Sequence, residues 1–84
     1  MTPEAVFAAI RDAVVTVMEV DPASVTRDTR LVTELKCDSL ALVEIAEIVE
    51  ENVPGLVIED AALDDIDTVG EAVDYALARL AVAS

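Results

Sequence analysis

The spacing of hydrophobic residues predicts a protein built from helices. Three stretches of the 84-residue chain carry apolar side chains at intervals of three and four, the pattern of one buried helix face. No stretch alternates apolar and polar residues as a half-buried strand does. The expected buried faces are Phe7, Ile10, Val14 and Val17, then Leu42, Ile45, Ala46, Val49 and Val53, and finally Val69, Ala72, Val73, Ala76, Leu77 and Leu80.

Capping and turn residues set the expected ends of these helices. A hydroxyl or carboxylate before a helix accepts one of its free N–H groups, and proline or glycine ends it. In chain order the signals are Thr2-Pro3-Glu4 as a start, Asp21-Pro22 as a stop after about Glu19, Asp38 or Ser39 as the second cap, Pro54-Gly55 as the second stop, and Thr68-Val69-Gly70-Glu71 as a capping box.

The connecting segments complete the expected fold. Val25, Leu31 and Leu35 are spaced to fix a long loop to the core, and loops of this length tend to be functional. A short helical turn is expected from Ile58 to Leu63, bounded by Asp64-Asp65, with Leu63 and Ile66 as its apolar anchors. We therefore predict an all-α single domain over residues 1–84. It is a small up-and-down bundle of three main helices plus one short helix, frayed from Ala81 to Ser84.

Composition indicates an aliphatic core of unusual compliance. Hydrophobic residues make up 55% of the chain, yet Phe7 and Tyr75 are its only aromatic residues. So high an apolar fraction argues against disorder. A core with so few rigid rings leads us to hypothesise that the bundle opens an internal apolar channel.

The charge of the chain is strongly acidic and unevenly placed. Eighteen acids and five bases give a net charge of −13, which excludes nucleic acids and anionic membranes as partners and favours basic ones. Twelve of the acids and one base lie in residues 37–84, and no base occurs between Asp38 and Asp74. The apolar runs are too short for a secretory signal or a membrane span, so we expect a cytoplasmic protein.

Several kinds of chemistry are excluded by what the chain lacks. It contains no histidine and one cysteine, Cys37, which removes histidine-dependent catalysis, an internal disulfide and a cysteine-rich zinc site. We predict no metal site. A lone cysteine is usually inert, and this interpretation of Cys37 is favoured over a reactive thiol.

Two residues of the second helix invite a functional interpretation. Ser39 is favoured as a plain helix cap, while a phosphate ester on its hydroxyl would be stabilised by the helix N-terminus. Leu40 stands among acids, opposite the buried face. It indicates either a partner surface or an ordinary isolated leucine.

A family resemblance changes the balance for Ser39. Leu35-Lys36-Cys37-Asp38-Ser39-Leu40, followed by Val43-Glu44-Ile45, resembles the Asp-Ser-Leu signature of acyl carrier proteins. The stretch from Asp67 to Tyr75 resembles their final helix, so the similarity spans essentially the whole chain. The resemblance implies a carrier without catalytic activity. Its 4′-phosphopantetheine arm would be joined to Ser39 by a phosphopantetheinyl transferase that uses coenzyme A, and acyl groups would ride on the arm as thioesters.

The resemblance also assigns expected roles to other residues and partners. Asp38 helps the transferase engage the serine. Docking of partner enzymes falls to Leu40, Val43, Glu44, Glu47, Glu50 and Glu51, and the acyl pocket to Leu42, Ala46, Ile58, Leu63 and Ile66. The implied partners are acyl-loading enzymes, ketosynthases or other acyl-processing enzymes with basic patches, in fatty-acid, polyketide or related biosynthesis. We expect the carrier to be a monomer.

Two positions depart from the family pattern, and two alternatives stay open. The family usually has glycine where this chain has Lys36, and many fatty-acid carriers have an apolar docking residue where it has Glu47. We expect Glu47 to meet an additional basic contact on a partner. The alternatives are a peptidyl or aryl carrier serving an adenylating enzyme, and a helical adaptor in which Ser39 only caps a helix.

Overall fold

Helices form nearly all of the regular structure in the computed structural model, which describes residues 2–83 and side chains up to residue 81. The elements are α1 (Pro3–Met18), a short 3-10 helix η1 (Pro22–Ser24), α2 (Ser39–Asn52), α3 (Asp60–Leu63) and α4 (Val69–Ala83). Across this described range there is no strand, only an isolated bridge between Arg30 and Thr68. The predicted all-α bundle of three main helices and one short helix is confirmed.

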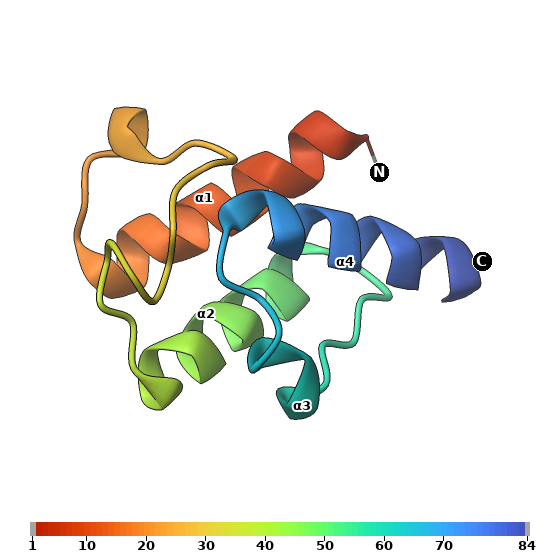
Figure 1. The fold of residues 1–84 in the computed structure, drawn as a ribbon. Helices are drawn as coiled ribbons and strands as arrows, with labels where there is room; N and C mark the ends of the chain where they lie inside the picture. The colour runs from red at the N-terminus through yellow and green to blue at the C-terminus, as the bar shows by residue number, and fades with distance from the viewer. Residues whose placement is uncertain (1, 84) are drawn as a thin grey trace.

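α1 is the central packing element of the bundle. It packs against both α2 and α4 and runs in the opposite direction to each (Figure 1). α2 and α4 run the same way, and their described backbones do not approach each other closely. Side chains from α3 and its flanking segments therefore fill the space between α2 and α4.

Each main helix begins with the cap that its sequence supplies. The Ala5 amide donates to Thr2 Oγ1 at 3.2 Å, and the Ala41 amide donates to the Asp38 carboxylate at 2.8 Å. At α4 the Thr68 amide donates to Glu71 Oε1 at 2.9 Å, and the Glu71 amide donates to Thr68 Oγ1 at 3.1 Å. The predicted capping box is thus confirmed, and Asp38 rather than Ser39 caps α2.

The core differs from the prediction in each main helix, since Leu42, Ala72, Leu77 and Leu80, all predicted as buried, are only half-buried. The fully buried residues of α1 are Val6, Ile10, Ala13 and Val14. Phe7 and Val17, predicted as core, are only half-buried against it. α1 packs between two helices, so the middle of its buried stripe falls on the four fully buried residues. Phe7 and Val17 lie at the edges of the stripe. α4 includes residues 81–83, which were expected to fray, and Ser84 lies outside the described residues.

The long loop between α1 and α2 is fixed to the segment that precedes α4. As predicted, Val25 and Leu31 are buried, and Leu35 is half-buried. The Leu31 amide donates to the Asp67 carbonyl at 2.6 Å, and the Gly70 amide donates to the Arg27 carbonyl at 2.8 Å. A Cβ on Gly70 would stand 3.0 Å from that carbonyl oxygen, a tighter contact than side chains ordinarily make, so a larger residue would require the loop to shift.

Two ion pairs reinforce this attachment. Arg30 pairs with Asp67 and Arg27 pairs with Asp74, each at 3.0 Å. Both join the loop to the start of α4. The chain that leads into Asp38 and Ser39 is therefore held by α4 as well as by its own core contacts.

Candidate functional site

Ser39 is presented at the surface with its hydroxyl uncommitted. It is the first residue of α2 and is exposed to solvent. The neighbouring Asp38 carboxylate already accepts the amide hydrogen of Ala41, so the serine is not needed as the cap. Among the described residues nothing hydrogen-bonds to the Ser39 side chain. This leaves a primary hydroxyl free for a covalent group at a helix N-terminus, where phosphate is electrostatically favoured.

Two open grooves meet at Ser39. The smaller, of about 300 Å³, runs between α2 and α3 and is lined by Ser39, Leu42, Val43, Asp60, Ala61, Leu63 and Asp64. The larger, of about 540 Å³, runs toward the long loop and is lined by Val32, Thr33, Cys37, Asp38, Ser39, Leu42, Leu63, Asp64, Asp65, Ile66 and Asp67. A group attached to the serine hydroxyl therefore has two surface paths along which to lie.

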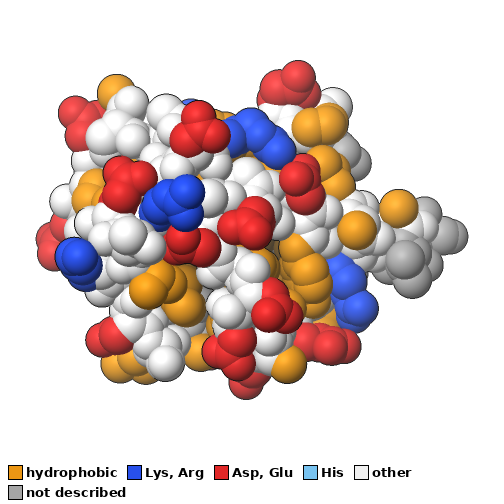
Figure 2. Space-filling model, viewed as in Figure 1, with side chains coloured by type: hydrophobic (Ala, Val, Ile, Leu, Met, Phe, Trp, Pro, Cys, Tyr) orange, Lys and Arg blue, Asp and Glu red, His pale blue; other side chains and the backbone are white. Residues whose placement is uncertain are grey.

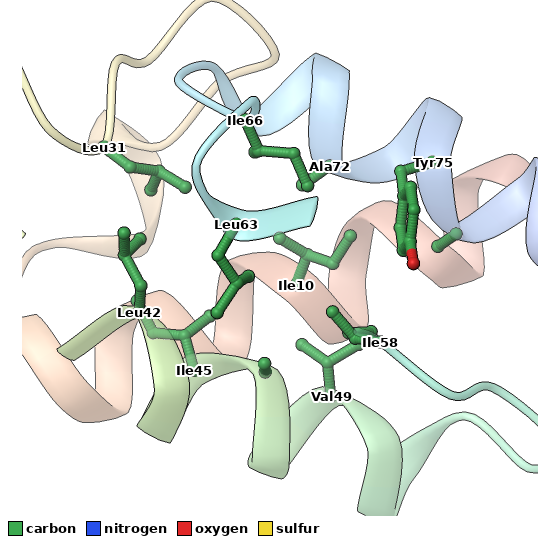
Figure 3. Close-up of a pocket in the computed structure, with 12 residues that line it drawn as sticks. Ile10, Leu31, Leu42, Ile45, Val49, Ile58, Leu63, Ile66, Ala72 and Tyr75 are labelled. Carbon is green, nitrogen blue, oxygen red and sulfur yellow. The ribbon is translucent and has the colours of Figure 1, made fainter. Parts of the chain in front are cut away.

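Behind these grooves lies an apolar cavity of about 40 Å³. Its lining residues are Ile10, Leu31, Leu42, Ile45, Ala46, Val49, Ile58, Leu63, Ile66, Ala72, Tyr75 and Ala76, which include all five residues assigned to an acyl pocket from the sequence. Figure 3 shows the labelled side chains of α2, α4 and the intervening segment pointing toward a common space. The space equals that of a few water molecules, so a longer guest needs the walls to separate.

The walls that must separate are not locked by a helix–helix interface. α2 and α4 face each other across the cavity without close backbone contact in the described chain. Ile58, Leu63 and Ile66, from the segment around α3, fill the gap between them. All three are only partly buried. We therefore expect widening of the cavity to displace this short helix and its flanks rather than the packing of α1 against α2 and α4.

The outward side of α2 carries an apolar residue among acids. Leu40 is 67% exposed, and Glu44, Glu47 and Glu51 are exposed along the same helix. Figure 2 shows acidic side chains outnumbering basic ones on the visible face, several of them at the lower edge where Figure 1 places α2 and α3. The ion pairs formed by residues 2–81 involve Arg11, Arg27, Arg30 and Arg79, and none reaches these glutamates.

Two of the residues assigned to docking from the sequence are half-buried, whereas the other four are exposed. Val43 is half-buried and lines the smaller groove. Glu50 is also half-buried, and its Oε2 accepts the Ile58 amide hydrogen at 2.8 Å. Glu50 therefore holds the segment after α2 in place, a role that the sequence does not reveal because the two residues are eight positions apart.

Cys37 and Lys36 precede the serine and have contrasting surroundings. Cys37 is only 5% exposed, and its burial, with a smaller effect from the charge of Asp38, raises the pKa of its thiol. A buried thiol with a raised pKa is a poor nucleophile. Lys36 is exposed and has a φ of 61°, in the left-handed region that favours glycine. Its backbone conformation gives a physical reason for the glycine that the family usually has there.

Tyr75 is the main site residue that the sequence analysis did not single out. Its ring lines the cavity, and its hydroxyl accepts the Glu59 amide hydrogen at 3.4 Å. The Arg79 guanidinium lies 6.0 Å from the ring centroid and pairs with Glu59 at 3.5 Å. The sequence does contain a feature that predicts this position. Tyr75 follows Ala72 by three residues and precedes Ala76, so the three side chains share one face of α4.

The class of protein follows from comparison with known families. Residues 8–76 match the family model described as "Phosphopantetheine attachment site". Members of this family carry a covalently attached 4′-phosphopantetheine. The uncommitted hydroxyl of Ser39, exposed between two grooves, fits the attachment of such a group.

Similar proteins narrow the assignment. An acyl carrier protein of Lactobacillus acidophilus is 37% identical over 75 residues, covering 89% of this chain and 92% of that protein. An acyl carrier protein of Thermotoga maritima is 33% identical over 72 residues, covering 86% of this chain and 88% of that protein. A meromycolate extension acyl carrier protein of Mycobacterium leprae is 35% identical over 75 residues, covering 89% of this chain and 64% of that protein. The chain belongs to the acyl carrier protein family.

Two further features of the described residues bear on its setting. None of the helices is both long and apolar enough to cross a membrane. No group of three or more cysteine or acidic side chains in the described part of the chain is arranged to hold a metal ion.

Proposed function

We propose that this protein carries acyl intermediates as thioesters on a 4′-phosphopantetheine arm attached to Ser39. It delivers them to separate enzymes of fatty-acid, polyketide or related biosynthesis and performs no catalysis itself. The observation that carries the proposal is the uncommitted, exposed hydroxyl of Ser39 between two grooves. Asp38 supplies the helix cap, which removes the reason for interpreting the serine as a cap alone.

The attachment step is the transfer of phosphopantetheine from coenzyme A to the serine. A bond forms between Ser39 Oγ and the phosphorus that bears pantetheine, and the anhydride bond of coenzyme A breaks. Adenosine 3′,5′-bisphosphate leaves, and the hydroxyl proton passes to a base on the transferase. The arm supplies the thiol for thioester chemistry, while the protein supplies its position and its partner surface.

The remaining residues support recognition and shelter. We propose that Leu40, Val43, Glu44, Glu47 and Glu51 form the docking surface for basic patches on the transferase and on acyl-processing enzymes. Exposed charges attract such patches over about 8 Å at physiological ionic strength. Leu42, Ala46, Ile58, Leu63 and Ile66 line the cavity in which the acyl chain is sheltered between deliveries.

Intact mass after incubation with coenzyme A and a phosphopantetheinyl transferase of broad specificity tests the attachment. We expect the mass to rise by one phosphopantetheine in the wild-type protein and in Ser24→Ala. Ser24 is a matched control because it is also an exposed serine of a helical turn, and its hydroxyl donates to the Asp21 carbonyl. The mass should stay unchanged in Ser39→Ala. A gain that persists in Ser39→Ala, or no gain in the wild type, would overturn the proposal.

A further inference from the structure

Tyr75 lies at the end of the cavity away from Ser39 (Figure 3). Leu42 and Leu63 belong both to the cavity and to the grooves beside the serine, so they mark its near end. Figure 3 shows Leu42 toward one side of the cavity and Tyr75 on the opposite side. A chain that enters past the two leucines therefore advances toward the tyrosine ring.

The tyrosine side chain contacts Glu59 and Arg79 at that end. Its hydroxyl accepts the amide hydrogen of Glu59, the residue that precedes α3, at 3.4 Å. Arg79, one turn further along α4, lies over the ring and pairs with the Glu59 carboxylate. These contacts tie α4 to the start of α3, so displacing the ring strains the attachment of both elements.

The other cavity residues of α4 do not provide such an obstacle. Ala72 and Ala76, which flank Tyr75 on the helix, end at Cβ. Tyr75 is the only aromatic residue in the lining and the only one whose side chain carries a polar atom. The bulk that stops an advancing chain on this helix is thus concentrated in one side chain.

From this geometry we propose that Tyr75 sets the length of acyl chain that the protein shelters. The inference rests on the proposed carrier function and adds the residue that determines its chain-length preference. Each methylene buried ahead of the ring stabilises the sheltered state by about 0.8 kcal/mol, or about fourfold in the ratio of sheltered to exposed chain. Methylenes added after the chain reaches the ring gain nothing. Shelter should rise with length and then stop rising.

The test uses the pantetheinylated protein loaded with a series of saturated acyl chains that differ by two carbons. Cleavage of the thioester by hydroxylamine reports the exposed fraction. In the wild type we expect cleavage to slow by up to about fifteenfold per two-carbon step and then to level off at a break. In Tyr75→Ala and Tyr75→Leu the break should move to longer chains by at least one step. Tyr75→Phe, which keeps the ring and loses the hydroxyl contact with Glu59, should keep the wild-type break.

A second measurement needs no variant and covers the case in which the truncated proteins do not fold. Tyr75 is the only tyrosine, and the chain has no tryptophan, so the intrinsic emission of the protein reports this ring. The emission should change first at the chain length where cleavage levels off. An unchanged emission across the series, or the same break in wild type, Tyr75→Ala and Tyr75→Leu, overturns the inference.

The outcomes also separate this inference from the proposed function. If intact mass shows the arm on Ser39 and the break does not depend on Tyr75, the carrier function stands and the inference is wrong. If cleavage shows no dependence on chain length in the wild type, the chains do not enter the cavity, and both the shelter and the role of Tyr75 are refuted. Attachment at Ser39, measured by mass, then still stands.

Discussion

Leu42 on α2 and Leu63 on α3 line the interior cavity and also both grooves that meet at Ser39. Both side chains are half-buried, with one side toward the core and the other toward the surface. α3 has four residues, and its backbone lies close to that of α2 alone among the described helices. The leucine pair is therefore the boundary between the two grooves at Ser39 and the interior, and the short helix α3 forms one side of that boundary.

Truncation of Leu63 should weaken this boundary. In Leu63→Ala the sheltered chain loses apolar contact, and we expect the thioester of a loaded chain to be cleaved by hydroxylamine about tenfold faster. The free energy of unfolding should fall by about 1–2 kcal/mol, less than for a fully buried leucine. Leu40→Ala is the matched control, since Leu40 is exposed and lines neither the cavity nor the two grooves. Equal cleavage rates in both variants would show that Leu63 does not guard the cavity.

The neighbours Asp38 and Ser39 should differ in their effects on stability. Asp38→Ala removes the acceptor for the Ala41 amide, and we expect a loss of about 1 kcal/mol, measured by urea denaturation. Ser39→Ala removes a hydroxyl that makes no hydrogen bond within the described chain, so its unfolding curve should match that of the wild type. A loss in Ser39→Ala as large as that in Asp38→Ala would restore the interpretation of the serine as a structural cap.

These two residues illustrate what the sequence alone predicts well. Helix starts are local features, so the caps, the capping box and the signature around the serine follow from residues within a few positions of one another. The five residues that the family resemblance assigned to an acyl pocket also lie around one cavity. Periodicity accounts only for Leu42 and Ala46, which are on the inward face of α2, because Ile58 and Ile66 lie outside the helices.

The missed features depend on contacts between residues distant in sequence. Val6 and Ala13 share the three- and four-residue spacing of Ile10 and Val14, but that spacing alone does not decide between a stripe centred on them and one that includes Phe7 and Val17. The packing of α1 between two helices centres it on Val6 and Ala13. Glu50 accepts the Ile58 amide hydrogen and the Tyr75 hydroxyl accepts the Glu59 amide hydrogen, and neither pairing is visible in the sequence. Such pairings require the path of the chain after α2, which the sequence pattern leaves undetermined.

Lys36 should be replaceable by glycine with a gain in stability. A non-glycine residue in the left-handed region costs about 1–2 kcal/mol, partly offset by the greater freedom of glycine in the unfolded chain. We expect Lys36→Gly to raise stability by about 1 kcal/mol and Tm by about 4–8 °C. Lys36→Ala removes the charge and keeps the strained conformation, so it should show no such gain. An equal rise in both variants would assign the effect to charge.

Acid should reduce the contribution of Glu71 to stability. Hydrogen bonds from the Thr68 and Asp67 amides hold the pKa of Glu71 below its ordinary value. A lowered folded-state pKa gives stability that is fully present above the unfolded pKa of about 4.3 and is lost as pH falls through the lower folded value. The difference in Tm between wild type and Glu71→Gln should therefore be constant near neutral pH and shrink below about pH 4. A difference that does not change with pH would contradict this.

The nearby Asp67 is a second acidic group whose pKa is lowered in the folded protein. Partial burial raises its pKa, but hydrogen bonds from Arg30 and the Val32 amide, together with the Arg30 charge, outweigh that effect and lower it. Asp67→Asn should show the same narrowing of the Tm difference in acid. Glu44→Gln is the control for general charge repulsion, because Glu44 is exposed and has no ion-pair partner among residues 2–81.

The glutamates of α2 should contribute unequally to docking. Glu47 is exposed and unpaired in the described structure, whereas Glu50 already accepts the Ile58 amide hydrogen. With a phosphopantetheinyl transferase of broad specificity as the partner, we expect Glu47→Met to lower kcat/KM at low salt, and Glu50→Gln to lower it less. Because exposed charge pairs are screened within about 8 Å at physiological ionic strength, the wild-type value should fall toward that of Glu47→Met as salt rises. If Glu47→Met turns over as fast as the wild type at low salt, Glu47 makes no basic contact with this enzyme. If the wild-type rate does not depend on salt, charge does not guide the docking.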